Sequence, residues 1–168
     1  MKNINDKDLE NIISVWEKTI DLQMHFNDIC MNIRKTAVGT LGVLLAAGAI
    51  AFRFGGKVSV FDNEVSIAFL FTVISIFVWM AFYLMDRFWY HELLRSTVKY
   101  SESLEDPAKK SGLSIPLNMS SKIREANHRA LKMSGAAKIN TFYWLVAAVL
   151  VLSSVFLFIG AVQPILKN

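Results

Sequence analysis

The sequence has little cysteine, the residue on which disulfide bonds and many structural zinc sites depend. It contains a single cysteine, Cys30, among 168 residues, so a disulfide framework and a cysteine-based zinc site are both excluded. We expect Cys30 to be a small apolar residue on a helix rather than a reactive thiol. Charge is also scarce, since 19% of the residues are charged and 54% are hydrophobic, against about 25% and about 45–50% in soluble domains. This composition excludes an intrinsically disordered chain and a collagen-like repeat.

Sequence motifs for catalysis or nucleotide binding are missing as well. No glycine-rich loop leads into a Lys-Ser or Lys-Thr pair, and no group of His, Asp and Glu has the spacing of metal ligands. Nothing in the sequence is similar to a nucleophile elbow. We therefore expect a protein that is not an enzyme and that has no cofactor and no metal site.

What the chain has instead is three long apolar runs. They cover residues 36–52, 65–85 and 141–162, which are 17, 21 and 22 residues long, and none of them contains a charged residue. About 20 apolar residues span a bilayer core, with a range of about 17–25. Lys35 and Arg53 can extend the shortest run by reaching the two membrane interfaces. A soluble helical bundle would instead carry polar residues along one face of each helix. We predict three transmembrane helices.

Lysine and arginine are distributed unequally between the segments that flank these runs. Residues 1–35 and 86–140 hold 15 of them, whereas the 53–64 loop and the C-terminal tail hold 3. The positive-inside rule then places the N-terminus and residues 86–140 in the cytoplasm, and the loop and the C-terminus outside. Orientation and attraction to anionic lipid account for the net charge of +4, so we expect the lipid bilayer and no nucleic acid as a partner.

Outside the apolar runs, the sequence predicts further helices. Apolar residues recur at spacings of three and four in residues 1–35, which predicts one amphipathic helix. Six acidic residues in the same segment favour contact with protein over contact with anionic lipid. We expect the second span to continue as a helix over residues 86–104, to break at Glu105-Asp106-Pro107, and to be followed by a helix over residues 120–137.

The short outer connection differs from the rest of the chain. It begins with Phe54-Gly55-Gly56, ends with Asp62-Asn63-Glu64 and contains Val58, Val60 and Phe61, which allows a small β-hairpin. The chain as a whole divides into five segments. These are a cytoplasmic amphipathic helix (1–35), the first two transmembrane helices with the outer loop 53–64 (36–85), a cytoplasmic helical segment (86–140), the third transmembrane helix (141–163) and an outer tail (164–168).

Two pairs of the form Arg-x-x-x-His are candidates for chemistry. They are Arg87 with His91 and Arg124 with His128, and each pair shares one face of its predicted helix. The pairs resemble the Arg-x4–6-His motif of HEPN-class RNases, although the spacing here is one residue shorter. The alternative is that these are polar residues on a helix surface near lipid headgroups, and we favour this alternative.

Small residues line one side of the first span. Gly39, Gly42, Ala46 and Ala49 recur at three and four residues, which allows the close helix packing on which association in lipid depends. The stripe can serve packing within one chain or between copies, and we favour contact between copies. We also expect an interfacial collar that orients the cytoplasmic helices. It comprises Arg87, Trp89, Tyr90, His91, Phe142 and Tyr143.

The sequence around the collar resembles the signature of RipA-type small bacterial membrane proteins. The similar residues are the run Asp86-Arg87-Phe88-Trp89-Tyr90-His91-Glu92-Leu93-Leu94, then Val98, Leu104-Glu105, Ile115-Pro116, Lys138-Ile139 and Phe142-Tyr143. The resemblance covers roughly residues 30–165. It implies an octameric ring of protomers in the bacterial inner membrane, with no catalytic residues to carry over.

These observations lead to an all-α membrane protein with three transmembrane helices and amphipathic cytoplasmic helices, assembled as a homo-oligomeric ring. Our leading hypothesis is a non-enzymatic scaffold or pore whose cytoplasmic face meets an unidentified cytoplasmic protein. The second hypothesis is a membrane-disrupting effector of a phage-defence or toxin system. The third is a membrane-tethered, HEPN-like RNase.

Overall fold

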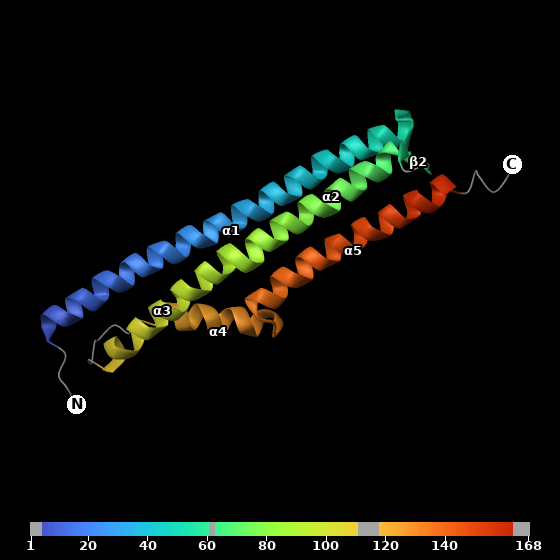
Figure 1. Ribbon diagram of the computed structural model, residues 1–168. Helices are drawn as coiled ribbons and strands as arrows, with labels where there is room; N and C mark the ends of the chain where they lie inside the picture. The colour runs from blue at the N-terminus through green and yellow to red at the C-terminus, as the bar shows by residue number, and fades with distance from the viewer. Residues whose placement is uncertain (1–4, 61–62, 111–117, 163–168) are drawn as a thin grey trace. The chain divides into compact units, whose positions relative to one another are not determined.

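The chain is almost entirely helical in the computed structural model, which describes residues 5–60, 63–110 and 118–162 (Figure 1). The elements in chain order are α1 (Asp6–Phe54), β1 (Lys57–Val60), β2 (Asn63–Ser66), α2 (Ile67–Leu84), the π-helix η1 (Met85–Tyr90), α3 (His91–Lys110), α4 (Met119–Leu131) and α5 (Gly135–Val162). Three helices are long and apolar enough to cross a membrane: α1, the helix that starts with α2, and α5. The predicted helical chain with three candidate spans is thereby confirmed.

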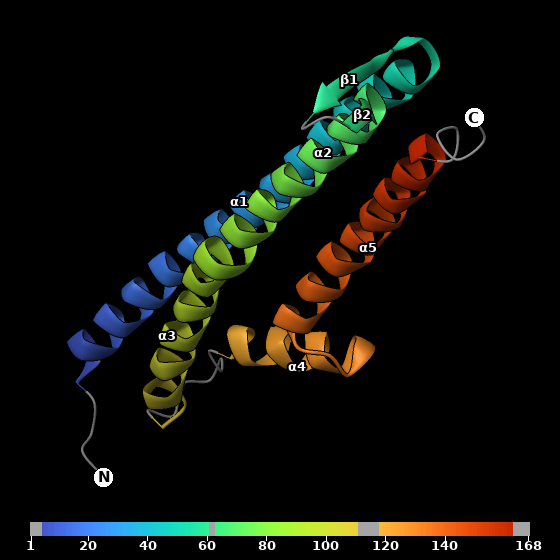
Figure 2. The ribbon, with the colours of Figure 1, turned by 45° about the vertical axis from the view of Figure 1, so that its right-hand side comes forward.

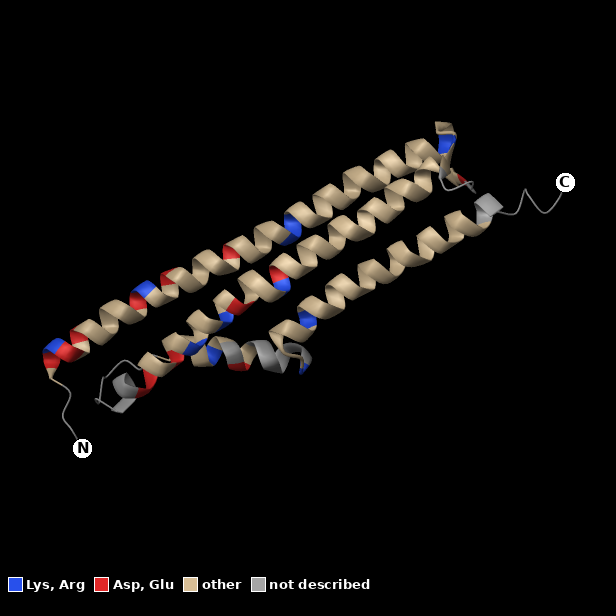
Figure 3. Cartoon of the chain, in the orientation of Figure 1, with Lys and Arg blue, Asp and Glu red and all other residues tan. Residues whose placement is uncertain are grey.

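The chain folds into two compact units. One comprises residues 1–31 and 86–138, and the other comprises residues 32–85 and 139–168. Figure 3 shows that Lys, Arg, Asp and Glu are frequent along the first part of α1 and along α3, and sparse along α2 and the greater part of α5. We therefore call the first unit the polar unit and the second the apolar unit.

Helix α1 begins and ends where its sequence favours a terminus. Asp6 and Asp8 lie in its first turn and Arg53 lies in its last, so charges of the favourable sign meet each end of the helix dipole. The N–H of Gly55 then donates to the carbonyl oxygen of Ala51 at 2.8 Å. A Cβ at residue 55 would collide with that same carbonyl group, so the close turn at the end of α1 requires glycine.

A two-stranded antiparallel hairpin follows α1, a structure that the turn-rich sequence allows. Lys57 pairs with Ser66 and Val58 pairs with Val65 across the two strands. The Nζ of Lys57 lies 3.0 Å from Oε2 of Glu64, and both side chains are exposed. The hydroxyl of Ser66 accepts a hydrogen bond from the backbone N–H of Ala68 at 3.3 Å and so caps the first turn of α2.

The core of the apolar unit is aromatic. Trp79 and Tyr143 are each 2% exposed, and their ring centroids lie 4.9 Å apart. The indole N–H of Trp79 donates to the backbone carbonyl of Tyr143 at 2.9 Å, which joins α2 to α5. Tyr83 extends the cluster, because its hydroxyl donates to the amide oxygen of Asn140 at 3.2 Å. The α1 residue Ala37 completes the contact among the three helices.

Two predicted helix boundaries are wrong. Pro107 does not end the helix, because α3 continues to Lys110. Proline removes one N–H donor and crowds the carbonyl group one turn earlier, but the buried residues Ser101 and Glu105 hold the preceding turns in place. The expected helix over residues 120–137 is interrupted instead. Lys132 has a positive φ of 50°, which ends α4, and the hydroxyl of Ser134 accepts from the N–H of Ala137 at 3.1 Å to start α5.

Candidate functional site

The junction that follows α2 has unusual backbone geometry. Residues Met85–Tyr90 form a π-helix between the α-helical segments α2 and α3. Short π-helical turns are rare and frequently mark functional sites. The turn begins at the end of the second apolar run, and its Asp86 side chain is fully buried. Four of the six predicted collar residues lie in this turn or at the residue that follows it.

The guanidinium group of Arg87 forms the main ion pair of the junction. Its Nη1 lies 3.0 Å from Oε1 of Glu92, and Arg95 lies 3.8 Å from the same oxygen. The hydrogen bond from Arg87 holds the pKa of the Glu92 carboxyl below its ordinary value of 4.5, against an opposing effect of desolvation. The positive charge of Arg95 acts in the same direction. Glu92 lies beyond the apolar run, so this pair belongs to the polar unit.

Large aromatic side chains extend from the same turn. Phe88 and Trp89 are 60% and 66% exposed, and the guanidinium carbon of Arg87 lies 5.4 Å from the centre of the Phe88 ring. Trp89 stacks on Tyr90 with ring centroids 6.2 Å apart. Exposed aromatic rings beside a paired arginine, directly after an apolar run, are the chemistry expected at a membrane interface.

The other two predicted collar residues lie in the apolar unit. Tyr143 is buried against Trp79 and is part of the core. Phe142 is 39% exposed, and its ring centroid lies 5.6 Å from that of Trp79. The collar residues thus fall into two groups. Arg87, Trp89, Tyr90 and His91 belong to the polar unit, and Phe142 and Tyr143 belong to the apolar unit.

The stripe of small residues on α1 lies open. Ideal Cβ atoms added to Gly39 and Gly42 would have no atom within 4 Å, and Ala46 and Ala49 are exposed. The close approach between helices of the apolar unit falls instead at Gly48, where an added Cβ would lie 3.4 Å from the Cβ of Phe71. Packing of α1 on α2 therefore leaves Gly39 and Gly42 without a neighbour among the described residues, whereas Ala49, the last residue of the stripe, faces a cavity within the same unit.

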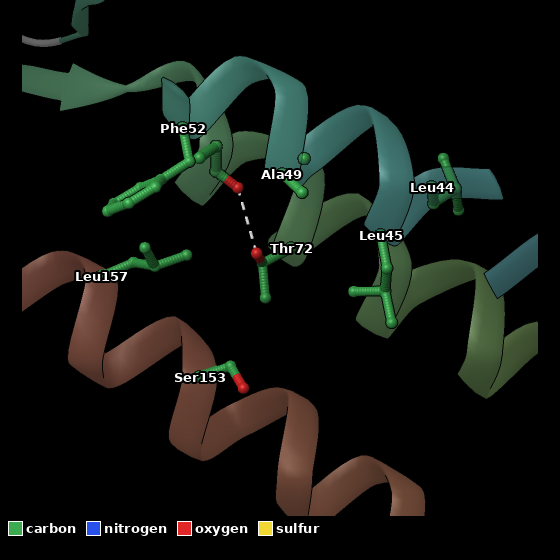
Figure 4. Close-up of a pocket in the computed structure, with 9 residues that line it drawn as sticks. Leu44, Leu45, Ala49, Phe52, Thr72, Ser153 and Leu157 are labelled. Atoms are coloured by element: carbon green, nitrogen blue, oxygen red, sulfur yellow. Dashed lines mark hydrogen bonds between the residues drawn. The ribbon is translucent and has the colours of Figure 1, made fainter. Parts of the chain in front are cut away.

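A cavity of about 270 Å³ lies among α1, α2 and α5 within the apolar unit (Figure 4). Leu45 and Phe52 of α1, Thr72 of α2, and Ser153 and Leu157 of α5 line it. Its two hydroxyl groups bond back to their own helices: Thr72 donates to Ala68 at 3.0 Å and Ser153 donates to Val149 at 2.9 Å. The described residues of the cavity thus present an apolar wall, and none of their polar groups is directed at a ligand.

Residues for catalysis are not gathered in one place within the described part of the chain. No group of three or more His, Cys, Asp and Glu side chains there could hold a metal ion. Arg87 is paired with Glu92 rather than with His91 in the described contacts. The side chains of Arg124 and His128 lie outside the described residues, so the second Arg-x-x-x-His pair stays a prediction.

Two buried residues were not singled out by the sequence as structural centres. Trp79 lies near the end of a uniformly apolar run, where its indole could equally have faced the interface. Glu105 is 1% exposed although it sits in the charged segment Glu105-Asp106, next to a proline. The one available signal for Trp79 is its need for a hydrogen-bond acceptor in an apolar setting. For Glu105, nothing local distinguishes a buried acid from an exposed one.

Comparisons with family models, with curated proteins and with solved structures give no match for this chain. The resemblance to RipA-type proteins therefore remains a prediction from the sequence. The site has to be interpreted from its own chemistry.

Proposed function

We propose that the protein is a non-enzymatic, homo-oligomeric protein of the bacterial inner membrane, in which copies of the chain form a ring-shaped scaffold or pore. The observation that carries the proposal is the open stripe of small residues on α1. Gly39 and Gly42 leave room for a helix backbone to approach closely, and no described residue of the same chain occupies that room. A second copy supplies the missing helix.

The small extent to which its own chain buries α1 supports this proposal. Within its most apolar stretch 6% of the residues are buried, against 22% in each of the other two candidate spans. On the same side as the stripe, Val43 is 71% exposed and Ile50 is 63% exposed. Three helices with so little mutual burial gain more from association with copies than from standing alone.

Charge supports an additional contact through the first part of α1. Its six acidic side chains are exposed and make no ion pair within the described part of the chain; they are Asp6, Asp8, Glu10, Glu17, Asp21 and Asp28. Lys122 on α4 and Lys132 after it are likewise exposed and unpaired among the described residues. Opposite charges on separate elements allow α1 of one copy to meet the α4 region of the next, and complementarity of this kind sets register between subunits.

The substitution Gly42→Leu tests the proposal. A leucine side chain fills the space that the neighbouring helix needs. We therefore expect the association constant of the oligomer to fall by at least about tenfold. Native mass spectrometry of the detergent-solubilised protein measures the assembly directly. Ala148→Leu is the matched control, because residue 148 is an exposed small residue on α5 outside the stripe, and we expect it to leave the oligomer intact.

Two results would contradict the proposal at different levels. If Gly42→Leu retains the oligomer mass of the parent protein, the stripe is not the contact. If the parent protein is itself a monomer in several mild detergents and in nanodiscs, the proposed assembly is wrong altogether.

A further inference from the structure

A single carboxylate joins the three segments of the polar unit. The Oε1 of Glu105 on α3 accepts a hydrogen bond from the backbone N–H of Ser120 on α4 at 2.9 Å. The same oxygen accepts from the indole N–H of Trp16 on α1 at 3.4 Å. Glu105 itself is 1% exposed. One buried oxygen atom therefore links parts of the chain that lie 15 and 89 residues apart in sequence.

The contact with Ser120 is a helix cap supplied by another helix. N–H groups in the first turn of a helix have no carbonyl partner within that helix. In α4 the N–H of Lys122 already bonds to Asn118 at 3.1 Å, whereas the N–H of Ser120 has Glu105 as its acceptor. A carboxylate is also the favourable charge at this end of the helix dipole. Glu105 thus satisfies the N-terminus of α4.

Further hydrogen bonds converge on the same residue of α4. The hydroxyl oxygens of Ser120 and Ser101 lie 2.7 Å apart, and the amide of Gln23 donates to Ser120 Oγ at 3.4 Å and to the carbonyl of Thr97 at 3.3 Å. Beyond this point α4 buries little of what is described, since Ile123 is 55% exposed. Figure 2 shows α4 turning away from the direction of α3. The described part of α4 is held at one polar point rather than along an apolar face.

The second carboxylate oxygen of Glu105 opposes this arrangement. Its Oε2 is buried and has no hydrogen-bond partner among the described residues. A buried carboxylate oxygen without a donor costs free energy that is recovered as soon as water reaches it. The same side chain therefore both holds α4 in place and carries a penalty for doing so. This penalty reduces the free-energy difference between the closed arrangement and one in which the carboxylate is hydrated, and a small difference is the requirement for a conformational switch.

We propose that Glu105 is a latch and that α4 alternates between a state closed on Glu105 and an open state. In the closed state Ser120 is capped and Ser101 is covered. In the open state the first turn of α4 and the hydroxyl of Ser101 become accessible from solvent, and the carboxylate of Glu105 is hydrated. Residues 132–134 connect α4 directly to the first turn of α5. The latch needs only the polar unit and does not depend on the proposed oligomer.

Amide hydrogen exchange at Ser120 tests the latch in the full-length protein in nanodiscs. This N–H has no acceptor within α4, so its protection reports the bond to Glu105. We expect Glu105→Ala to accelerate its exchange by about tenfold or more. Glu105→Gln keeps an oxygen acceptor but removes the charge, so we expect a smaller acceleration of about threefold. Asp106→Asn changes the exposed neighbouring acid and serves as the control, with exchange as in the parent protein.

Hydrogen exchange of amides in the middle of α3 and in the first part of α1 distinguishes two roles of Glu105. It either holds α4 alone or stabilises the whole polar unit. If only the first turn of α4 exchanges faster in Glu105→Ala, the latch is supported. The proposal is overturned if Ser120 stays protected in Glu105→Ala, since another group then holds α4. It is equally overturned if α1, α3 and α4 all lose protection together, because Glu105 then stabilises the whole unit rather than one movable helix.

Discussion

The interactions that hold the helices together inside the apolar unit differ from those inside the polar unit. In the apolar unit, helices from distant parts of the sequence meet through tilted aromatic rings in contact, with Trp79 and Tyr143 at the centre. In the polar unit, helices meet through side-chain hydrogen bonds around Glu105 and Ser120. Lipid removes the hydrophobic drive between helices, so association there depends on packing and on a few hydrogen bonds. Water that enters the polar unit competes for its hydrogen bonds, which makes that unit the easier one to open.

The strongest test of this contrast is Trp79→Ala. The substitution removes a fully packed ring and the hydrogen bond to Tyr143, so we expect the unfolding free energy in detergent to fall by about 3 kcal/mol. Phe77→Ala is the control on the same helix, because Phe77 is 70% exposed and should change stability by less than about 0.5 kcal/mol. Titration with SDS, followed by circular dichroism, measures both. Equal unfolding midpoints for the two variants would show that the aromatic core does not hold the unit.

A matched pair of Trp→Phe substitutions sharpens the comparison. Trp79→Phe keeps a ring but removes the buried 2.9 Å hydrogen bond, with an expected cost of about 1 kcal/mol. Trp16→Phe removes a partly buried bond of 3.4 Å, and we expect a cost below about 0.5 kcal/mol. Hydrogen exchange in α5 reports the first change, and exchange in α3 reports the second. A larger loss of stability in Trp16→Phe than in Trp79→Phe would show that the indole hydrogen bond matters more in the polar unit than in the apolar unit.

The smallest expected effect is a pH dependence in the polar unit. Because Arg87 lowers the pKa of Glu92, the pair stabilises the folded state above the ordinary carboxyl value of 4.5 and is lost as the pH falls through the lower folded value. In Arg87→Gln the Glu92 pKa should rise toward 4.5. Carbon-detected NMR of the Glu92 carboxyl measures this change directly. An unchanged titration midpoint in Arg87→Gln would mean that Arg95, and not Arg87, sets the charge state.

Much of the fold follows from the sequence because charge interrupts the apolar runs so cleanly. The run 65–85 corresponds to a helix that starts at Ile67, and the turn-rich loop before it forms the hairpin that its sequence allowed. Helix ends in the polar unit were harder to predict. The effect of Pro107 was outweighed by burial of Glu105, and the break after Leu131 depends on a left-handed lysine that no propensity favours.

The candidate site was predictable only in part. Residue type and position indicated that Arg87 and Trp89 follow an apolar run, and both lie directly after it. The sequence did not reveal that Tyr143 is buried while Trp89 is exposed, since both are aromatic residues at the edge of a run. Which ring turns inward depends on the partner across the helix interface, and that partner lies 64 residues away for Trp79 and Tyr143.

The hydroxyl groups of α2 bear on the order in which the chain can be assembled. Thr72 donates to Ala68, and Ser75 donates to Phe71 at 2.8 Å, so both are satisfied by the carbonyl one turn earlier in the same helix. These hydroxyls therefore need no hydrogen-bond acceptor from a neighbouring helix when α2 leaves the translocation machinery. The indole of Trp79 does need a neighbour, because its acceptor lies on α5, which the ribosome synthesises after α2. Completion of the apolar unit is therefore a docking step that follows the synthesis of α5.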